Sequence, residues 1–244
     1  DSFYLLKGIL MSDWSSKKPT GAIILDDGII FKGYGCGFEG SAIGEVCFNT
    51  AMTGYQEIMT DPSYASQIIT FTFPHIGNVG TNLEDTESKN VPEIKGAIFN
   101  SPITSPSNWR SKKNLNQWLI DNKIVALYGV DTRSITTHIR EKGFMNGIII
   151  NDQNGFNDND SFKNELSKWE GIVGKDLAKI VSTKKIYNWS EKEIDFLSNK
   201  IETINKHIVI IDYGVKNNIL RCLASRFNKL TIVPCDTSSE KILN

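Results

Sequence analysis

Residues 44–82 read GEVCFNTAMTGYQEIMTDPSYASQIITFTFPHIGNVGTN and contain neither lysine nor arginine, although the chain of 244 residues carries 27 of them. At the average density, about four would be expected in a stretch of this length. The stretch is rich in Thr, Gly, Asn, Pro and aromatic residues, which form turns and close backbone contacts rather than solvated faces. Two interpretations stay open: a functional surface, or a buried segment, because Ile, Phe and Val alternate through part of it.

The overall composition is that of an ordinary soluble, cytoplasmic protein with one large domain or two small ones. Hydrophobic residues make up 40% and the formal net charge is −1, without the basic stripe of a nucleic-acid-binding surface. No stretch approaches the ~18 apolar residues of a membrane span, and the opening DSFYLLKGIL lacks the flanks of a secretory signal. Met11 is a candidate natural start, which would make residues 1–10 an extension. We expect no metal site and reduced, packed thiols at Cys36, Cys47, Cys222 and Cys235.

The first half of the chain predicts a mixed fold in which strands outnumber helices. An Asp-Gly pair at residues 27–28 lies between two apolar runs and indicates a hairpin. One helix is predicted over residues 113–122, and a second has Thr132 or Ser134 as its candidate cap and Gly143 as its end. Strands are predicted at residues 21–25, 29–32, 45–49, 67–73, 94–99, 124–128 and 147–150.

The composition changes after the first half. Residues 151–160 read NDQNGFNDND and cannot supply a core, so they predict a loop or a boundary. Apolar residues at helical spacing between 162 and 169 predict a short helix, and the charged residues 187–206 predict a variable connection. We therefore expect an N-terminal extension at 1–18, a first domain at 19–150, a linker region at 151–206 and a second domain from 207 to 244.

Residues 207–244 predict the opening of a parallel α/β sheet. The strand IVIID is followed by a Tyr-Gly turn, an amphipathic helix over 217–226 and a second strand over 230–233. That order is one βαβ unit, and residues 236–240 have the composition of a further helix start. Because two parallel strands and one crossover helix cannot cover both faces of a sheet, we expect the second domain to be incomplete in this sequence.

Three motifs together carry a family resemblance. GxVxFNTxMTGYQEIxTDPSYxxQIxTFTxPHIGNVGTN, DTRxxTxxIREKG and IDYGVKxNILR occur in this order. Their combination resembles the small, glutamine-hydrolysing chain of carbamoyl-phosphate synthase over residues 19–244, most weakly over 185–206. The resemblance implies an α/β protein with an N-terminal three-layer β/β/α domain, followed by the first βαβ unit of a class I glutamine amidotransferase domain.

The resemblance also implies a function and a partner. The small chain of that family releases ammonia from L-glutamine, and the ammonia passes through a tunnel to a large chain. The large chain combines it with bicarbonate, using ATP and Mg, to make carbamoyl phosphate for pyrimidine and arginine synthesis. The complete protein would thus be one subunit of a heterodimeric ligase. No Gly-rich phosphate loop is present, so we expect no cofactor on this chain itself.

None of the four cysteines can be assigned as the catalytic nucleophile that the resemblance implies. A class I amidotransferase needs a Cys nucleophile, a His base and a Glu that orients it, and in the family these lie beyond Asn244. We therefore expect the 244-residue chain alone to be inactive. Cys47 and His75 share one short stretch, but a thiol on an alternating strand is more typical of a core. His75 after a proline is more typical of a turn.

Two residues match the family's glutamine site. Ser63, in Asp-Pro-Ser-Tyr, corresponds to a serine that reaches from the first domain to bound glutamine, and a hydroxyl suits a zwitterionic ligand because it both donates and accepts. It could equally be a turn serine. Lys216, after the first strand of the second domain, corresponds to a lysine near the glutamine site, at the sheet edge where α/β folds bind ligands. Its alternative interpretation is a solvated lysine at a helix start.

Two classes of function remain after this reading. One is an amidotransferase subunit of a ligase, and the other is a noncatalytic scaffold that binds a partner through its first domain. In either case we expect the lysine-free stretch to contribute to docking, because charged residues are depleted at interface cores. The run Asp131-Thr132-Arg133 predicts a helix cap and an exposed arginine with a secondary interface role.

Overall fold

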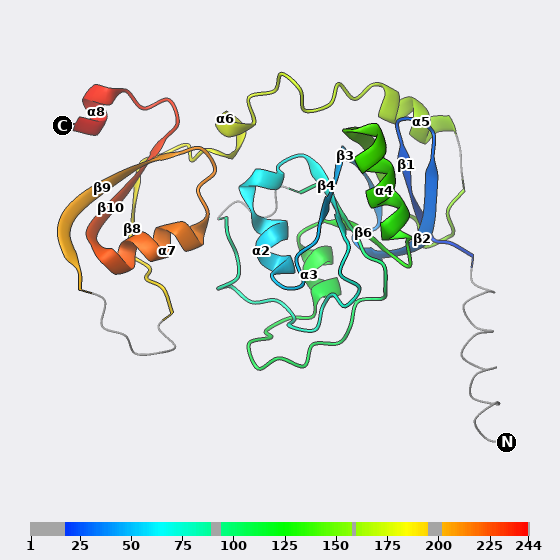
Figure 1. The fold of residues 1–244 in the computed structure, drawn as a ribbon, viewed down its shortest axis with the longest axis horizontal. Coiled ribbons are helices and arrows are strands. Elements are labelled where there is room, and N and C mark those ends of the chain that lie inside the picture. Colours follow the sequence, from blue (N-terminus) through cyan, green and yellow to red (C-terminus); the bar gives the residue numbers. More distant parts are fainter. Residues whose placement is uncertain (1–17, 89–93, 158–159, 195–201, 244) are drawn as a thin grey trace.

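The computed structural model describes residues 18–88, 94–157, 160–194 and 202–243, and it is a mixed α/β structure (Figure 1). Its first part, which runs from β1 to β7 over residues 21–151, is dominated by a sheet. Seven strands of that part form one closed sheet, in which the four neighbours β3 to β6 run parallel and the other pairs are antiparallel. Around the sheet the order is β1 (Gly21–Leu25), β2 (Ile30–Gly37), β6 (Val125–Tyr128), β5 (Gly96–Ile98), β4 (Gln67–Phe71), β3 (Gly40–Asn49) and β7 (Met145–Asn151), which pairs with β1.

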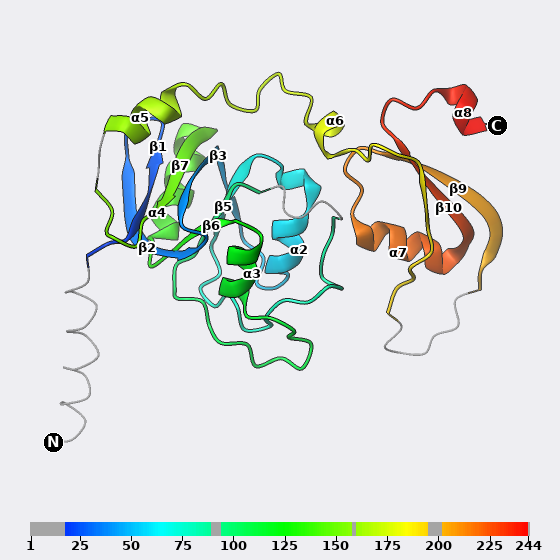
Figure 2. The same ribbon diagram turned by 180° about the vertical axis from the view of Figure 1, so that it is seen from behind.

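The alternation of strand side chains distributes the apolar residues over both faces of this sheet. Ile23 and Leu25 belong to an inner cluster that draws on every strand and on α4 (Thr132–Lys142), whereas Ile24 packs outside with Leu166 of α5 (Asp160–Ser167). A third cluster joins α2 (Tyr55–Thr60) and α3 (Leu115–Asp121) to the outer face of β4, β5 and β6 (Figure 2). Both faces are thus covered, which explains why β1 is a continuous apolar run.

Most of the elements predicted for the first half are confirmed, with β2, β3 and β7 longer than predicted and β4, β5 and β6 shorter. The hairpin is present, with Ile24 opposite Ile30 and Gly28 at a φ of +89°. Strands β2 and β3 extend through glycine-rich segments of low strand propensity, because pairing with β6 and β7 fixes them there. Helix α2 was not predicted, since its six residues lie in a stretch full of turn formers.

Thr132 and Ser134 were wrong as candidate caps of α4, whereas the prediction that the run Asp131-Thr132-Arg133 contains the cap is confirmed. Asp131 is the N-cap, and its carboxylate accepts hydrogen bonds from the Ser134 N–H at 2.9 Å and the Ser134 hydroxyl at 2.7 Å. Thr132 is instead the first residue of the helix, and it is buried. Gly143 ends the helix as predicted, at a φ of +93°.

The second part contains the predicted parallel βαβ unit. Strands β9 (Ile204–Asp212) and β10 (Phe227–Pro234) flank α7 (Asn217–Arg226), with Ile208 opposite Leu230. A third strand, β8 (Tyr187–Trp189), lies antiparallel on the other side of β10, in the segment that was predicted to be a variable connection. It belongs to the sheet because Trp189 is buried among Leu220, Leu230 and their neighbours. Two short helices, α6 (Leu177–Val181) and α8 (Ser239–Leu243), complete the described elements.

We predict that the two parts differ in local stability. Strand β9 lies at one edge of the three-stranded sheet, and Ile211 on it is 40% exposed. Edge strands with little apolar cover open more readily than strands of a closed sheet. Hydrogen exchange followed by mass spectrometry should therefore show faster exchange over residues 207–244 than over residues 21–150. Equal protection of the two regions would contradict this expectation.

Candidate functional site

The candidate site lies where β9 ends and α7 begins. Asp212, the last residue of β9, is buried, and its carboxylate holds the chain around it. Oδ1 accepts hydrogen bonds from the N–H groups of Gly214 and Val215, both at 2.9 Å, and Oδ2 accepts one from the Thr183 N–H at 2.7 Å. The turn requires glycine at position 214, because its φ is +93° and a Cβ there would lie 2.8 Å from Val181 Cγ2.

Lys216 follows this turn and reaches the first part of the chain. Its Nζ lies 2.6 Å from Oδ2 of Asp61, whose side chain is only 6% exposed. The other oxygen of Asp61, Oδ1, accepts a hydrogen bond from the Ser63 N–H at 2.9 Å. The hydrogen bond to Asp61 raises the pKa of Lys216, so the ammonium stays protonated. One buried carboxylate therefore holds both residues that were predicted for the glutamine site.

Ser63 itself is exposed on a single turn of 3-10 helix, η1 (Pro62–Tyr64). Asp61 is the N-cap of that turn, and Pro62 at its first position has the fixed φ that suits a helix start. The turn-forming interpretation and the ligand-binding interpretation of Ser63 are therefore compatible, because the backbone N–H makes the turn and the residue is exposed.

The first turn of α7 takes its capping groups from the first part of the chain. Lys216 stands at the N-cap position without a side-chain cap. The carbonyl of Glu87 accepts from the Asn217 N–H, and the carboxylate of Glu87 accepts from the Asn218 N–H, both at 2.9 Å. The Asn217 side chain donates to the carbonyl of Thr86 at 2.9 Å. A negative charge at a helix N-terminus is favourable, so Glu87 both caps α7 and joins the two parts.

A pocket of about 300 Å³ opens beside this joint. Its volume is at the lower end of that of ligand pockets, about 300–1,000 Å³. Ser63 and Lys216 do not line it, but their chain neighbours Pro62, Val215 and Asn217 do. Its hydroxyl, amide and ammonium groups suit a carboxylate of a small polar ligand, and the Asp212 carboxylate suits an ammonium group of such a ligand. Its lining comprises Pro62, Ser88, Val181, Thr183, Lys184, Lys185, Tyr187, Asp212, Gly214, Val215 and Asn217.

The structure thus brings Ser63 and Lys216 to one site and adds two residues that the sequence analysis missed. Asp61 lies in the quoted Asp-Pro-Ser-Tyr turn, and an Asp before a Pro is a recognisable turn signal. Glu87 lies just after the lysine-free stretch and carries no local signal, because the helix that it caps is remote in the sequence.

The cysteines and His75 have separate partners. Cys47 Sγ donates to Gln67 Oε1 at 3.7 Å, and burial raises the pKa of this thiol to about 12. The ring of His75 lies edge-on to Phe73, with their centroids 6.0 Å apart. Burial also raises the pKa of Cys36 to about 12 and, together with Glu193, raises that of Cys222. Such thiols are poor nucleophiles because little thiolate forms near neutral pH.

No group of three or more His, Cys, Asp or Glu side chains in the described ranges is arranged to hold a metal ion. None of the described helices combines the length and the apolar character needed to span a bilayer.

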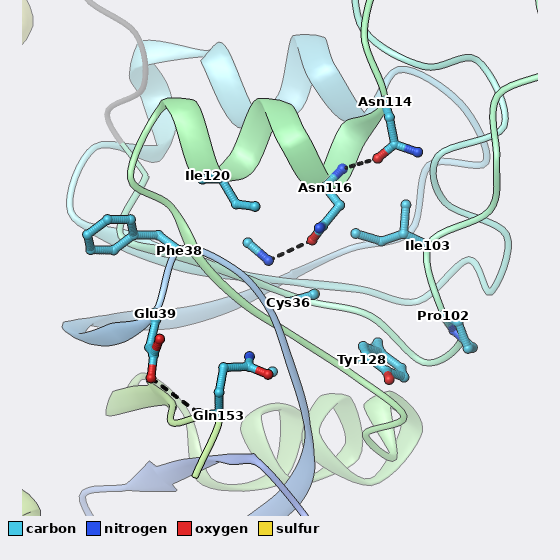
Figure 3. Close-up of a pocket in the computed structure, with 12 residues that line it drawn as sticks. Cys36, Phe38, Glu39, Pro102, Ile103, Asn114, Asn116, Ile120, Tyr128 and Gln153 are labelled. Carbon is cyan, nitrogen blue, oxygen red and sulfur yellow. Dashed lines mark hydrogen bonds between the residues drawn. The ribbon is translucent and has the colours of Figure 1, made fainter. Parts of the chain in front are cut away.

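A roomier pocket, of about 810 Å³, lies at the far end of β2 and carries little reactive chemistry (Figure 3). Figure 3 shows Asn116 and Ile120 of α3 on one side, and Glu39 and Gln153 on the other. The Asn116 side chain accepts from the Gly37 N–H at 2.8 Å, and Glu39 accepts from the Gln153 N–H at 3.4 Å. The first of these bonds joins α3 to β2, and the second joins the turn before β3 to the residues after β7. Both hold the fold together, so we assign the candidate site to the smaller pocket.

Comparisons with known proteins agree with the motifs. A family model described as carbamoyl-phosphate synthase small chain, CPSase domain, matches residues 23–149. The carbamoyl phosphate synthase small chain of Bartonella quintana (strain Toulouse) is 54% identical over 237 residues, which is 94% of this chain and 59% of that protein. That of Mesorhizobium japonicum is 50% identical over 236 residues, again 94% and 59%. The chain thus spans about 59% of the length of these curated relatives.

We predict that Asp61 and Lys216 are energetically coupled. In a double-mutant cycle of Asp61→Asn and Lys216→Met, the coupling free energy of unfolding should be about 0.5–1 kcal/mol, because Lys216 is 43% exposed and partly screened. The control is the same cycle on Asp121 and Lys113, an ion pair with both side chains more exposed, which should give a smaller value. Equal couplings would contradict a special role for Asp61.

The same coupling should depend on pH in one direction. The pKa of Lys216 is raised in the folded state, so the stabilisation is fully present below the ordinary lysine value, about 10.4, and is lost as pH rises through the folded pKa. Urea unfolding at about pH 7 and pH 9 should give the same coupling, and a decline should begin only above the ordinary lysine value.

Proposed function

The chain belongs to the carbamoyl-phosphate synthase small-chain family, and on that premise we propose that it is part of the glutamine-hydrolysing subunit of carbamoyl-phosphate synthase. In this proposal the complete protein releases ammonia from L-glutamine, and a large chain uses the ammonia, with ATP and Mg, to make carbamoyl phosphate. The product would serve pyrimidine and arginine synthesis in the cytoplasm.

The observation that carries the proposal is the junction at Asp61. It holds the Ser63 turn of the first part against Lys216 of the second, beside a pocket of suitable size for a small ligand. We propose that Ser63 donates or accepts a hydrogen bond to bound glutamine and that Lys216 lies near the same ligand. The exposed hydroxyl of Ser63 and the persistent positive charge of Lys216 support these roles.

The finer architecture also belongs to this proposal. The closed sheet, with α2 and α3 over one outer face, supports the three-layer β/β/α domain that the family implies. The parallel unit β9-α7-β10 supports the start of a class I glutamine amidotransferase domain. Lys216 would then lie at the carboxyl edge of that sheet, the usual ligand edge of α/β folds.

We propose that the 244-residue chain does not hydrolyse glutamine by itself. The raised pKa values of Cys36, Cys47 and Cys222 argue against each as the nucleophile. Lys216 and Ser63 would bind and orient the substrate, whereas the Cys nucleophile, the His base and its Glu would come from residues outside this sequence. No cofactor or metal is required of this chain in the proposal.

For the partner, we propose that the first part of the chain docks the large chain. Core packing accounts for many apolar residues of the lysine-free stretch, among them Ile68, Ile69 and Phe71. Its exposed part includes residues 50–53, between β3 and α2, where Met52 is 70% exposed. An exposed, uncharged segment with a flexible apolar side chain suits the centre of an interface.

We predict that Ser63→Ala in the complete protein weakens the use of glutamine and leaves ammonia-dependent synthesis intact. Loss of one hydrogen bond to a charged ligand should lower kcat/KM for glutamine about ten- to a hundredfold. Ser66→Ala, a nearby replacement outside the junction, is the control. If steady-state kinetics gave unchanged values for glutamine, Ser63 would be only a turn residue, and the scaffold alternative would gain.

We also predict that Met52→Glu weakens binding of the 244-residue chain to a carbamoyl-phosphate synthase large chain. A charge buried without a partner at an interface should raise Kd at least about tenfold. Val173→Glu is the matched control, because Val173 is 90% exposed but lies outside the lysine-free stretch. Calorimetry that gave the same Kd for both variants and the unmodified chain would count against docking through this segment.

A further inference from the structure

A polar groove of about 490 Å³ lies along α4, away from the candidate glutamine site. It collects residues that follow the parallel strands: Thr72 comes after β4, Asn100 after β5, and α4 itself after β6. The carboxyl ends of parallel strands are where α/β sheets commonly bind their ligands. The groove also unites two of the sequence motifs, since Thr72 belongs to the lysine-free stretch, residues 44–82, and α4 carries DTRxxTxxIREKG.

The groove carries two arginines that form no ion pair among the described residues. They are Arg133 and Arg140, and both are exposed. The nearest acid in sequence to Arg133 is Asp131, whose carboxylate already accepts two hydrogen bonds from Ser134. Hydrogen bonds from Ser134 lower the pKa of the Asp131 carboxylate most, and the charge of Arg133 adds a smaller effect. Glu141 adjoins Arg140 on the exposed surface of the helix.

The spacing of the two arginines favours an extended ligand. They are seven residues apart, which is two helical turns or about 10 Å along the axis of α4. Thr136 and Thr137 lie between them and also line the groove. In the extended polyproline II conformation the chain rises about 3.1 Å per residue with three residues per turn. Acidic side chains three residues apart then lie on one face of the peptide about 9 Å apart, which matches this separation. Arginine is enriched at protein interfaces because its planar fork binds carboxylates with two hydrogen bonds.

We propose that this groove receives an extended acidic segment of the protein with which the chain assembles. Its carboxylates would pair with Arg133 and Arg140, and the threonine hydroxyls would bind the backbone between them. A small apolar ligand is disfavoured by the polar lining. The identification of the partner with the large chain rests on the proposed function, whereas the acidic chemistry of the segment rests on the groove alone.

The test uses the 244-residue chain with Arg133 and Arg140 both changed to Glu. At low salt the association rate with a carbamoyl-phosphate synthase large chain should fall about tenfold, and the difference should shrink at high salt, because exposed charge pairs are screened. Lys112→Glu with Lys229→Glu is the matched control, with the same change of net charge at exposed lysines outside the groove. An equal fall in the control, or an unchanged rate in the arginine variant, would overturn the proposal.

A second probe separates this proposal from the proposed function. Labelled hexa-glutamate should bind the unmodified chain and not the arginine variant, even if the large chain proves not to be the partner. Absence of hexa-glutamate binding to the unmodified chain would overturn the groove assignment. So would inorganic phosphate that binds there and is not displaced by hexa-glutamate, since the groove would then be a site for a free anion. Thermal unfolding of both variants checks that they fold.

Discussion

The relation between the two parts of the molecule depends on the buried carboxylate of Asp61. A carboxylate removed from water costs free energy unless hydrogen bonds and a counter-charge satisfy it. Here both oxygens are used, one by the Ser63 N–H in the same turn and one by Lys216 from the other part. The turn at Ser63 and the contact with Lys216 therefore bind the same carboxylate, and both are needed to compensate for its burial.

The capping of α7 adds a second link of the same kind. Because Lys216 offers no side-chain cap, the first N–H groups of the helix depend on Glu87, whose own N–H donates to the buried Thr60 hydroxyl at 2.9 Å. Thr60 ends α2 and Asp61 follows it directly. Lys216 is thus bound by Asp61, and α7 is capped by Glu87, which is bound in turn to the neighbouring Thr60. A shift of α7 would therefore move the Ser63 turn as well.

Local patterns predicted much of the fold, whereas Ser63 and Lys216 were taken from the family resemblance. The Asp-Gly hairpin, the alternating strands and the strand-helix-strand order of the second part follow from periodicity and turn chemistry. Asp61 and Glu87 did not emerge, because their partners Lys216 and Asn218 are distant in sequence. Strand β8 was missed for a related reason: its three residues become a strand only by pairing with β10.

The lysine-free stretch shows why depletion of charge is an ambiguous signal. Burial in the core explains the absence of lysine at positions such as Ile69, Phe71 and Ile76, and only a short exposed part is left for contact with a partner. An exposed arginine without an ion-pair partner is a more specific signal of a binding surface when it lines a groove of hydroxyl groups. An arginine that is merely solvated does not need such surroundings. At α4, Arg133 and Arg140 lie in such a groove, together with Thr72 of the lysine-free stretch. An apolar contact at Met52 and the charged groove at α4 would together fix the orientation of a docked chain, which neither could do alone.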